Sequence, residues 1–159
     1  MRRRELLTLA ASGVLASGVL GATSAAAQSS LRDKYRWKRR LVLVFAPVRP
    51  HPSLAVQRER FKAAADGLAD RDMTVIEIVQ DTVFLNGKPT IELNARALRQ
   101  EFDISVVEFS VILIGKDGGE KLRRDEPLAV ERLFEVVDAM PMRQQEMRQR
   151  GQTKAERES

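Results

Sequence analysis

The stretch "RLVLVFAPVRPHPSL", Arg40 to Leu54, decides the fold class of this chain. Its first part, Leu41 to Ala46, is apolar on consecutive residues, which predicts a strand buried on both faces of a helix-covered sheet. A proline-rich loop begins at Pro47, and Ser53 is a candidate N-cap for a helix that we expect to reach about Ala69. A strand, a loop and a helix in this order are typical of an α/β domain.

The rest of the sequence repeats this alternation of strand and helix signals. Asn86-Gly87 predicts a tight hairpin turn, because both residues tolerate the positive φ of a type I′ turn. Asn94 is a candidate cap for a short helix, and Pro127 suits the first turn of a last helix. Three further strands are predicted at Met73–Val79, at Phe109–Gly115 and, as the antiparallel partner of the latter, in "EKLRR". We therefore expect a single α/β domain, with a central mixed sheet of about four to five strands flanked by helices. The order of its elements is the layout of a thioredoxin-like domain, an assignment that rests partly on analogy.

The first 27 residues read as a cleaved export signal. They have a basic start, a mildly apolar run and an Ala25-Ala26-Ala27 cleavage site of the A-x-A kind. Arg3-Arg4 also fits a twin-arginine signal loosely, so the twin-arginine and general export routes both stay open. The predicted organisation is signal 1–27, basic arm 28–40, domain 41–150 and disordered tail 151–159.

Composition removes several function classes. The sequence has no cysteine, which excludes disulfides, thiolate metal sites and thiol catalysis together. Its single histidine excludes a multi-histidine metal site, so we expect no metal and no cofactor. Once the signal is cleaved, no run of 18 apolar residues remains, and we predict no membrane span and a monomer.

Charge is concentrated at the two ends of the chain. Residues 32–40 contain six basic residues and one acid, a net charge of +5, and residues 143–159 have a net charge of +2. Between them, residues 41–142 contain 13 basic and 17 acidic residues, a net charge of −4. A basic arm on a mildly acidic body predicts contact with an anionic surface and argues against a nucleic-acid-binding face.

The loop "PVRPHP" is the best candidate ligand site. Arg49 and His51 precede the first predicted helix, whose free N–H groups favour an anion such as a carboxylate or phosphate. The alternative is that the prolines only stiffen the connection and both side chains point into solvent. No conspicuous nucleophile accompanies the histidine, so we predict no catalytic residues.

The arm "YRWKRR" is the candidate anionic-surface site. Cations interleaved with aromatic residues suit anionic surfaces, although Tyr35 and Trp37 could equally cover one end of the core. The cations assigned to this site are Lys34, Arg36, Lys38, Arg39 and Arg40.

Near the other end of the chain, "MPMRQQEMRQR" offers a candidate partner site. Met140, Met142 and Met147 are interleaved with polar residues and either pack the last helix onto the sheet or form an adaptable apolar patch. In the second case, Met142 and Arg143 would anchor a partner.

Three stretches, "LRDKYRWKRRLVLVFAP", "VILIGKDGGEKLR" and "DAMPMRQQEMRQR", resemble the family catalogued as domain of unknown function 4174, which is also present in vertebrate secreted sushi-repeat matrix proteins. The resemblance covers about Leu31 to Arg150 and implies a thioredoxin-like, peroxiredoxin-related fold and export, but no reaction. Aligned with a thioredoxin active-site loop, Arg49 and Pro52 occupy the two cysteine positions. The chain also lacks the cis-proline that redox-active members carry before the third strand.

These observations predict a redox-inactive binding or adaptor module in the bacterial cell envelope, periplasmic or secreted. Its partner would be an envelope protein or an anionic ligand held by the "PVRPHP" face. The alternative is a non-thiol enzyme or anionic-ligand-binding protein that uses Arg49 and His51. A third possibility is electrostatic attachment to anionic envelope polymers through the basic arm.

Overall fold

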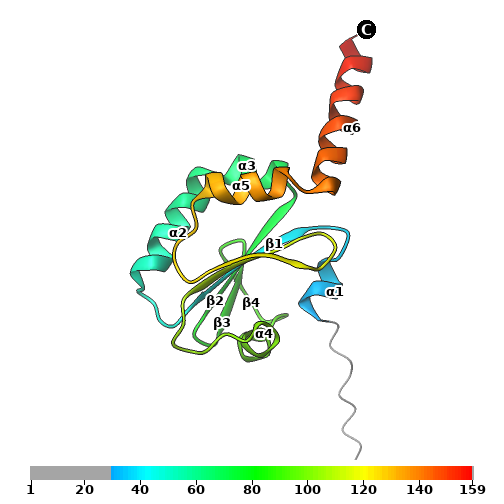
Figure 1. Ribbon diagram of the computed structural model, residues 1–159. Helices are drawn as coiled ribbons and strands as arrows, with labels where there is room; N and C mark the ends of the chain where they lie inside the picture. The colour runs from blue at the N-terminus through cyan, green and yellow to red at the C-terminus, as the bar shows by residue number, and fades with distance from the viewer. Residues whose placement is uncertain (1–29, 159) are drawn as a thin grey trace, which may run out of the picture.

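The computed structural model describes residues 30–158 of the chain, so the predicted export signal lies outside the described residues. The domain is a mixed α/β fold in which helices cover both faces of a six-stranded sheet (Figure 1). The helices are α1 Leu31–Tyr35, α2 Pro52–Ala63, α3 Ala65–Asp70, α4 Ala95–Phe102, α5 Val130–Asp138 and α6 Pro141–Glu158. The strands are β1 Arg40–Ala46, β2 Met73–Val79, β3 Thr82–Leu85, β4 Lys88–Thr90, β5 Ser110–Ile114 and β6 Glu120–Arg124.

The sheet has the strand order β4-β3-β2-β1-β5-β6, which places β1 near its middle. Strand β1 pairs parallel with β2 through the α2–α3 crossover and antiparallel with β5. All seven residues of β1 are buried. The apolar run predicts this for Leu41 to Ala46, whereas Arg40, which was assigned to the basic arm, is buried as well. The α/β class and the thioredoxin-like arrangement are confirmed, and the sheet has one strand more than the larger number expected.

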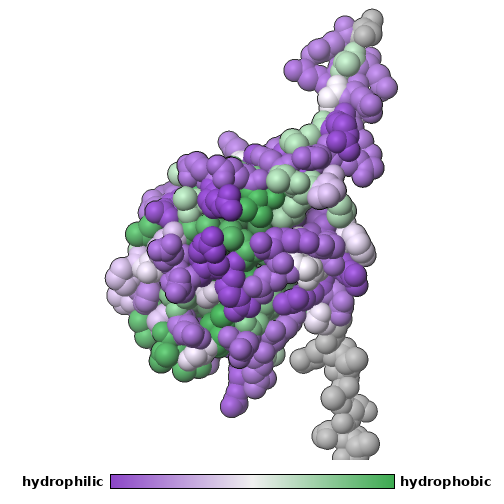
Figure 2. Space-filling model, in the orientation of Figure 1, coloured by the Kyte–Doolittle hydropathy of each residue, from purple (hydrophilic) through white to green (hydrophobic). Residues whose placement is uncertain are grey.

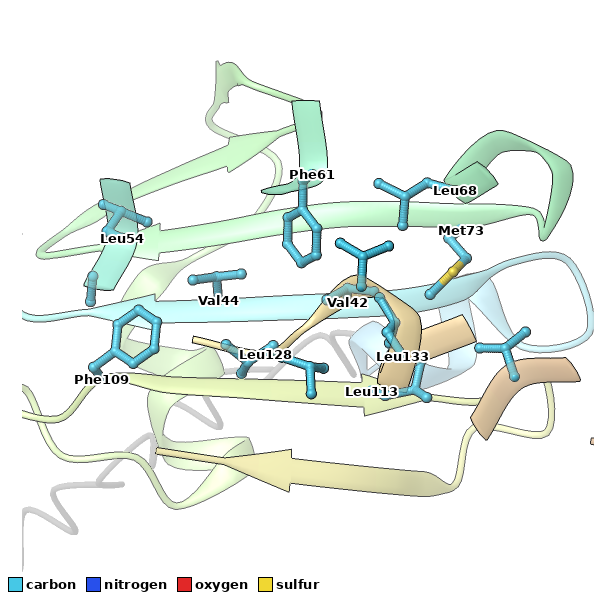
Figure 3. Close-up of a cluster of buried hydrophobic side chains, with 14 of the residues drawn as sticks. Val42, Val44, Leu54, Phe61, Leu68, Met73, Phe109, Leu113, Leu128 and Leu133 are labelled. Atoms are coloured by element: carbon cyan, nitrogen blue, oxygen red, sulfur yellow. The ribbon is translucent and has the colours of Figure 1, made fainter. Parts of the chain in front are cut away.

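Two apolar clusters lie on the two faces of the sheet. The larger one packs β1 and β5 against α2, α3 and α5, with Leu54, Phe61 and Leu133 among its members (Figure 3). The second packs the opposite face against α1 and α4. Close helix packing on the first face requires Gly67 of α3, because a Cβ there would lie 2.6 Å from the Phe134 ring of α5.

The hairpin turn at Asn86-Gly87 and the helix cap at Asn94, both predicted from the sequence, are present in the structure. Asn86 and Gly87 both have positive φ, 48° and 80°, as the predicted hairpin turn requires. The Asn94 side chain caps α4 by accepting a hydrogen bond from the Ala97 N–H at 2.9 Å.

The helix that we expected from Ser53 to about Ala69 differs from its prediction. The N-cap of α2 is His51, and Pro52 takes the first helical position, where its missing N–H has no cost, so the predicted Ser53 cap is wrong. The helix also breaks at Ala64, which separates α2 from α3.

The two ends of the described region, residues 30–158, contain helical residues that were not predicted from the sequence. Helix α1 forms within the basic arm, where Ser30 Oγ accepts a hydrogen bond from the Asp33 N–H and Leu31 is buried. Helix α6 continues to Glu158, through residues 151–158 of the tail for which we expected disorder. Figure 1 shows α6 projecting away from the body of the domain.

Candidate functional site

The carboxyl ends of β1 and β2 meet at one edge of the sheet, where α/β proteins commonly bind ligands. Three connections converge there: the β1–α2 loop (47–51), the β2–β3 turn (80–81) and the segment from the end of α4 to β5 (103–109). Strand β5 begins at this edge because it runs antiparallel to β1. We call this end of the molecule the carboxyl edge.

A cavity of about 710 Å³ opens at the carboxyl edge. Two arginines and three carboxylates contribute to its wall, so it presents both signs of charge. Its lining residues are Asp81, Arg96, Arg99, Gln100, Asp103, Ile104, Ser105, Val106 and Glu108. Among residues 30–158, no group of three or more His, Cys, Asp or Glu side chains is arranged to hold a metal ion.

Arg99 organises this cavity from a buried position on α4. Its Nη2 donates to the carbonyl of Ala46 at 2.9 Å and to that of Ile78 at 3.5 Å, and its Nη1 donates to the Ser105 carbonyl at 3.0 Å. One guanidinium therefore joins the ends of β1 and β2 to the segment before β5. Its Nε is buried without a hydrogen-bond partner.

Burial lowers the pKa of Arg99, and the nearby carboxylates of Asp81 and Glu108 oppose that effect. Sequence reasoning did not identify Arg99, although a signal was present. Residues 95, 98, 99 and 102 form the buried face of α4, and Arg99 is the charged member of that otherwise apolar set.

His51 connects two of the converging segments. Its ring stacks on Phe109 with a centroid distance of 5.6 Å and an interplanar angle of 4°. Its Nδ1 is buried without a hydrogen-bond partner, and no carboxylate in residues 30–158 hydrogen bonds to either ring nitrogen. The stack fixes the β1–α2 loop against the residues that precede β5.

Arg49 points toward a different part of the sheet. Its guanidinium lies 4.7 Å from the centroid of the Phe84 ring on β3. Because β3 and β5 lie on opposite sides of β1, Arg49 and His51 contact different ends of the carboxyl edge. A shared anion pocket formed by these two residues stays a prediction.

Exposed valines surround the same edge. Val48 is 45% exposed, Val106 is 69% exposed and Val107 is 75% exposed. On the face drawn in Figure 2, hydrophobic surface is present in the middle, below α5, and at the lower left, the end at which Figure 1 shows the β1–α2 loop and the segment before β5. Apolar side chains presented next to a polar cavity are typical of an interaction surface.

The five cations assigned to the basic arm separate into two groups. Lys34 pairs with Glu92 at 2.9 Å, and Arg40 is fully buried in an ion pair with Glu146. Arg36, Lys38 and Arg39 are exposed. The aromatic residues separate as well, since Tyr35 packs against the second core cluster and Trp37 is largely exposed.

The structure places Met142 and Arg143 at the opposite end of the sheet from the carboxyl edge, at the start of α6. Arg143 is buried and forms ion pairs with Asp70 and, at 3.2 Å, with Asp138. Met142 lines an apolar groove of about 350 Å³ between the β5–β6 hairpin and the junction of α5 and α6. A partner contact through these residues stays a prediction.

Comparison with known proteins agrees with the fold described above. The structure of reduced 2-Cys peroxiredoxin from Plasmodium vivax superposes with a TM-score of 0.52 and 11% identity, over 70% of this chain and 83% of that one. The chain therefore has a thioredoxin-like fold, and its sequence contains no cysteine. It belongs to the family described as Domain of unknown function (DUF4174), whose model matches residues 31–146.

Two animal proteins illustrate the relatives of this domain. Coiled-coil domain-containing protein 80 of Danio rerio is 28% identical over 132 residues, which is 72% of this chain and 15% of that protein. Sushi repeat-containing protein SRPX of Homo sapiens is 31% identical over 126 residues, 75% of this chain and 26% of that protein. The chain thus spans about a quarter or less of these relatives. No helix within residues 30–158 combines the length and apolarity needed to cross a bilayer.

Proposed function

We propose that this chain is an exported binding module of the bacterial cell envelope and that it binds a protein partner at the carboxyl edge. The observation that carries the proposal is the set of exposed valines on two segments that meet there, Val48 on one and Val106 and Val107 on the other. Exposed apolar side chains beside polar residues are typical of a protein-binding surface.

The edge is also held in place before any partner arrives. Arg99 hydrogen bonds to backbone carbonyls at the ends of β1 and β2 and at Ser105, and the His51–Phe109 stack fixes the neighbouring loop. A surface that is ordered in the free protein loses less conformational entropy on binding. Rigid support of this kind favours specific binding of a folded partner or an extended peptide.

The absence of cysteine excludes the thiol chemistry that other proteins of this fold perform. A non-thiol enzyme or an anion-binding protein that uses Arg49 and His51 remains the alternative. It is the weaker candidate, because the two side chains contact Phe84 and Phe109 on opposite sides of β1. Carboxylates of Asp81, Asp103 and Glu108 in the adjacent cavity would also oppose an anion.

Site-specific photo-crosslinking in the native cell tests the proposal. A photoreactive residue at Val107 is expected to give one discrete protein adduct, and one at Val48 is expected to give the same adduct. Met147 on α6, 40% exposed and also apolar, is the matched control, with Gln149 as a polar control. Equal adducts from Met147, or none from either valine in a folded and abundant chain, would rule out this face as the partner site.

Export is tested separately by the N-terminal residue of the chain recovered from the envelope. Cleavage after Ala27 makes that residue Gln28, whereas an uncleaved chain would retain the signal. Replacing Arg3 and Arg4 by lysine distinguishes the routes, because a twin-arginine signal is expected to lose export and a general signal is expected to keep it.

A further inference from the structure

The turn between α1 and β1, residues 36–39, lies at the end of the sheet opposite the carboxyl edge. It immediately precedes Arg40, the first residue of β1, and lies beside the base of α6 (Figure 1). We call it the Trp37 turn. It takes no part in the proposed partner site, so its properties require a separate explanation.

All four side chains of the Trp37 turn are exposed. Trp37, the single tryptophan of the sequence, is 59% exposed, and the Arg36 guanidinium lies 5.2 Å from the centroid of its ring. Within residues 30–158, neither Arg36 nor Lys38 nor Arg39 forms an ion pair. The turn therefore presents an exposed indole and three exposed cations that make no direct ion pair.

The backbone makes the presence of tryptophan at this position unusual. Trp37 has a φ of 64°, in the left-handed region where glycine and asparagine are comfortable and a bulky side chain is strained. The surrounding structure imposes this conformation, since the Trp37 N–H donates to the Lys116 carbonyl at 2.6 Å and the Lys38 and Arg39 N–H groups both donate to the Tyr35 carbonyl. A strained residue with an exposed side chain indicates a use outside the folding of the domain.

Helix α6 brings further positive charge to this end of the molecule. The pKa of the Asp72 carboxyl is lowered, although burial, the largest single effect, acts to raise it. A hydrogen bond from Lys116 and the nearby charges of Lys116, Arg150 and Arg39 lower it. Lys154 and Arg157 follow Arg150 at helical spacing and line the same shallow groove. Asp70 and Glu158 pair with Arg150 and Lys154 of this stripe, and at the Trp37 turn Asp72 is the carboxylate close to Arg39.

We propose that the Trp37 turn attaches the exported protein to the surface of a bilayer that contains anionic phospholipid. An indole prefers the interface between headgroups and acyl chains, where its ring is in an apolar layer and its N–H meets water. Each lysine or arginine held near such a surface strengthens binding about fivefold. A soluble anionic polymer would use the cations but has no apolar layer for the exposed ring.

Attachment at this end leaves the carboxyl edge free, because the two surfaces lie at opposite ends of β1 (Figure 1). The chain could then hold a protein partner and a membrane at the same time. The two proposals depend on different residues and are tested independently.

Because Trp37 is the single tryptophan, the tryptophan fluorescence of the unmodified exported chain reports on this turn alone. The probes are vesicles of phosphatidylglycerol mixed with phosphatidylcholine, and vesicles of phosphatidylcholine alone. We expect a blue shift of the emission maximum with the anionic vesicles, quenching by lipids brominated on the acyl chains, and a much smaller response with the neutral vesicles. Added salt is expected to weaken the binding.

Variants measured by sedimentation with the same vesicles separate the two contributions. Arg36→Gln, Lys38→Gln and Arg39→Gln together are expected to weaken binding about a hundredfold. Lys88→Gln, Arg124→Gln and Arg132→Gln together, which remove the same charge from exposed positions elsewhere, are the matched control and are expected to have a much smaller effect. Trp37→Gly is expected to weaken binding while the domain stays folded.

Three results would overturn the proposal. One is an emission maximum that does not move with anionic vesicles. Another is equal loss of binding in the turn variant and in the charge-matched control, which would indicate attraction by net charge alone. The third is binding to soluble dextran sulfate as tight as binding to vesicles, with no quenching by brominated lipids, which would assign the turn to anionic polymers.

Discussion

Arg40 on β1 and Glu146 on α6 are 106 residues apart in the sequence and form a two-bond ion pair, with Nη1–Oε2 and Nη2–Oε1 distances of 3.2 Å. The Arg40 side chain is fully buried, and its Nη1 also donates to the Arg71 carbonyl at 2.8 Å. Lys116 extends the cluster, with Nζ 2.8 Å from Glu146 and 2.9 Å from Asp72. The start of α6 is thus fastened to the end of the sheet that is opposite the carboxyl edge.

Replacing Glu146 by glutamine is expected to lower the free energy of unfolding by about 3 kcal/mol, because it leaves the buried Arg40 charge without its partner. Urea denaturation measures the change. Glu135→Gln on α5 is the matched control, since Glu135 pairs with Arg132 in solvent and such a pair contributes about 0.5 kcal/mol. Similar losses in the two variants would show that the buried pair does not fasten α6.

The same cluster predicts a dependence of stability on pH. Burial acts to raise the pKa of the Glu146 carboxyl, but hydrogen bonds from Lys116 and Arg40 hold it below the ordinary value. The pKa of the neighbouring Asp138 carboxyl is lowered in the same way, against burial, by hydrogen bonds from Arg71 and Arg143. A carboxyl whose pKa is lower in the folded state than in the unfolded state stabilises the fold at pH values above its unfolded-state pKa. That stabilisation is lost as the folded protein's carboxyl is protonated. The free energy of unfolding should therefore fall as pH decreases below about 5, the range in which unfolded carboxylates begin to titrate.

Thermal unfolding between pH 7 and pH 3 measures this dependence. The Glu146→Gln variant should lose less stability over the same range, because one of the titrating groups is gone. A melting temperature that stays constant down to pH 3.5 in the unsubstituted chain would contradict the prediction.

Arg99→Met should lower the free energy of unfolding by about 2 kcal/mol, because the buried carbonyls of Ala46 and Ile78 lose their donor, as does the partly buried carbonyl of Ser105. Arg99→Lys should not restore it, since an ammonium cannot reproduce the planar geometry of a guanidinium. Hydrogen exchange at residues 105–108 should accelerate in both variants. Arg96→Gln, exposed on the same helix, is the control and should stay within about 0.5 kcal/mol of the unsubstituted chain.

Trp37→Gly should leave the free energy of unfolding unchanged or raise it by up to about 1 kcal/mol, because glycine adopts a φ of 64° without strain. Lys38→Gly is the control, since position 38 has no positive φ and glycine there only adds freedom to the unfolded chain, at a cost of about 0.5–1 kcal/mol. Denaturation curves of the two variants measure the difference. A loss of more than about 1 kcal/mol in Trp37→Gly would mean that the indole stabilises the domain itself.

The sequence predicted those parts of the fold that depend on neighbouring residues. The unbroken apolar run of β1 indicated a strand covered on both faces, and the turn at Asn86-Gly87 and the cap at Asn94 are properties of a few adjacent residues. The cysteine-free composition also excluded thiol chemistry without any knowledge of the structure.

Tertiary structure alone determined which cations are buried and which are free. The cations between Arg36 and Arg40 look alike in sequence, yet Arg40 is fully buried and Arg36 is exposed. Arg40 forms a direct ion pair with Glu146 from the far end of the chain, and Arg36 has no such partner within residues 30–158. Arg99 is a similar case, since its carbonyl partner at Ala46 is 53 residues away. An arginine becomes buried when distant groups can neutralise it and accept its hydrogen bonds, and a local pattern contains no record of those groups.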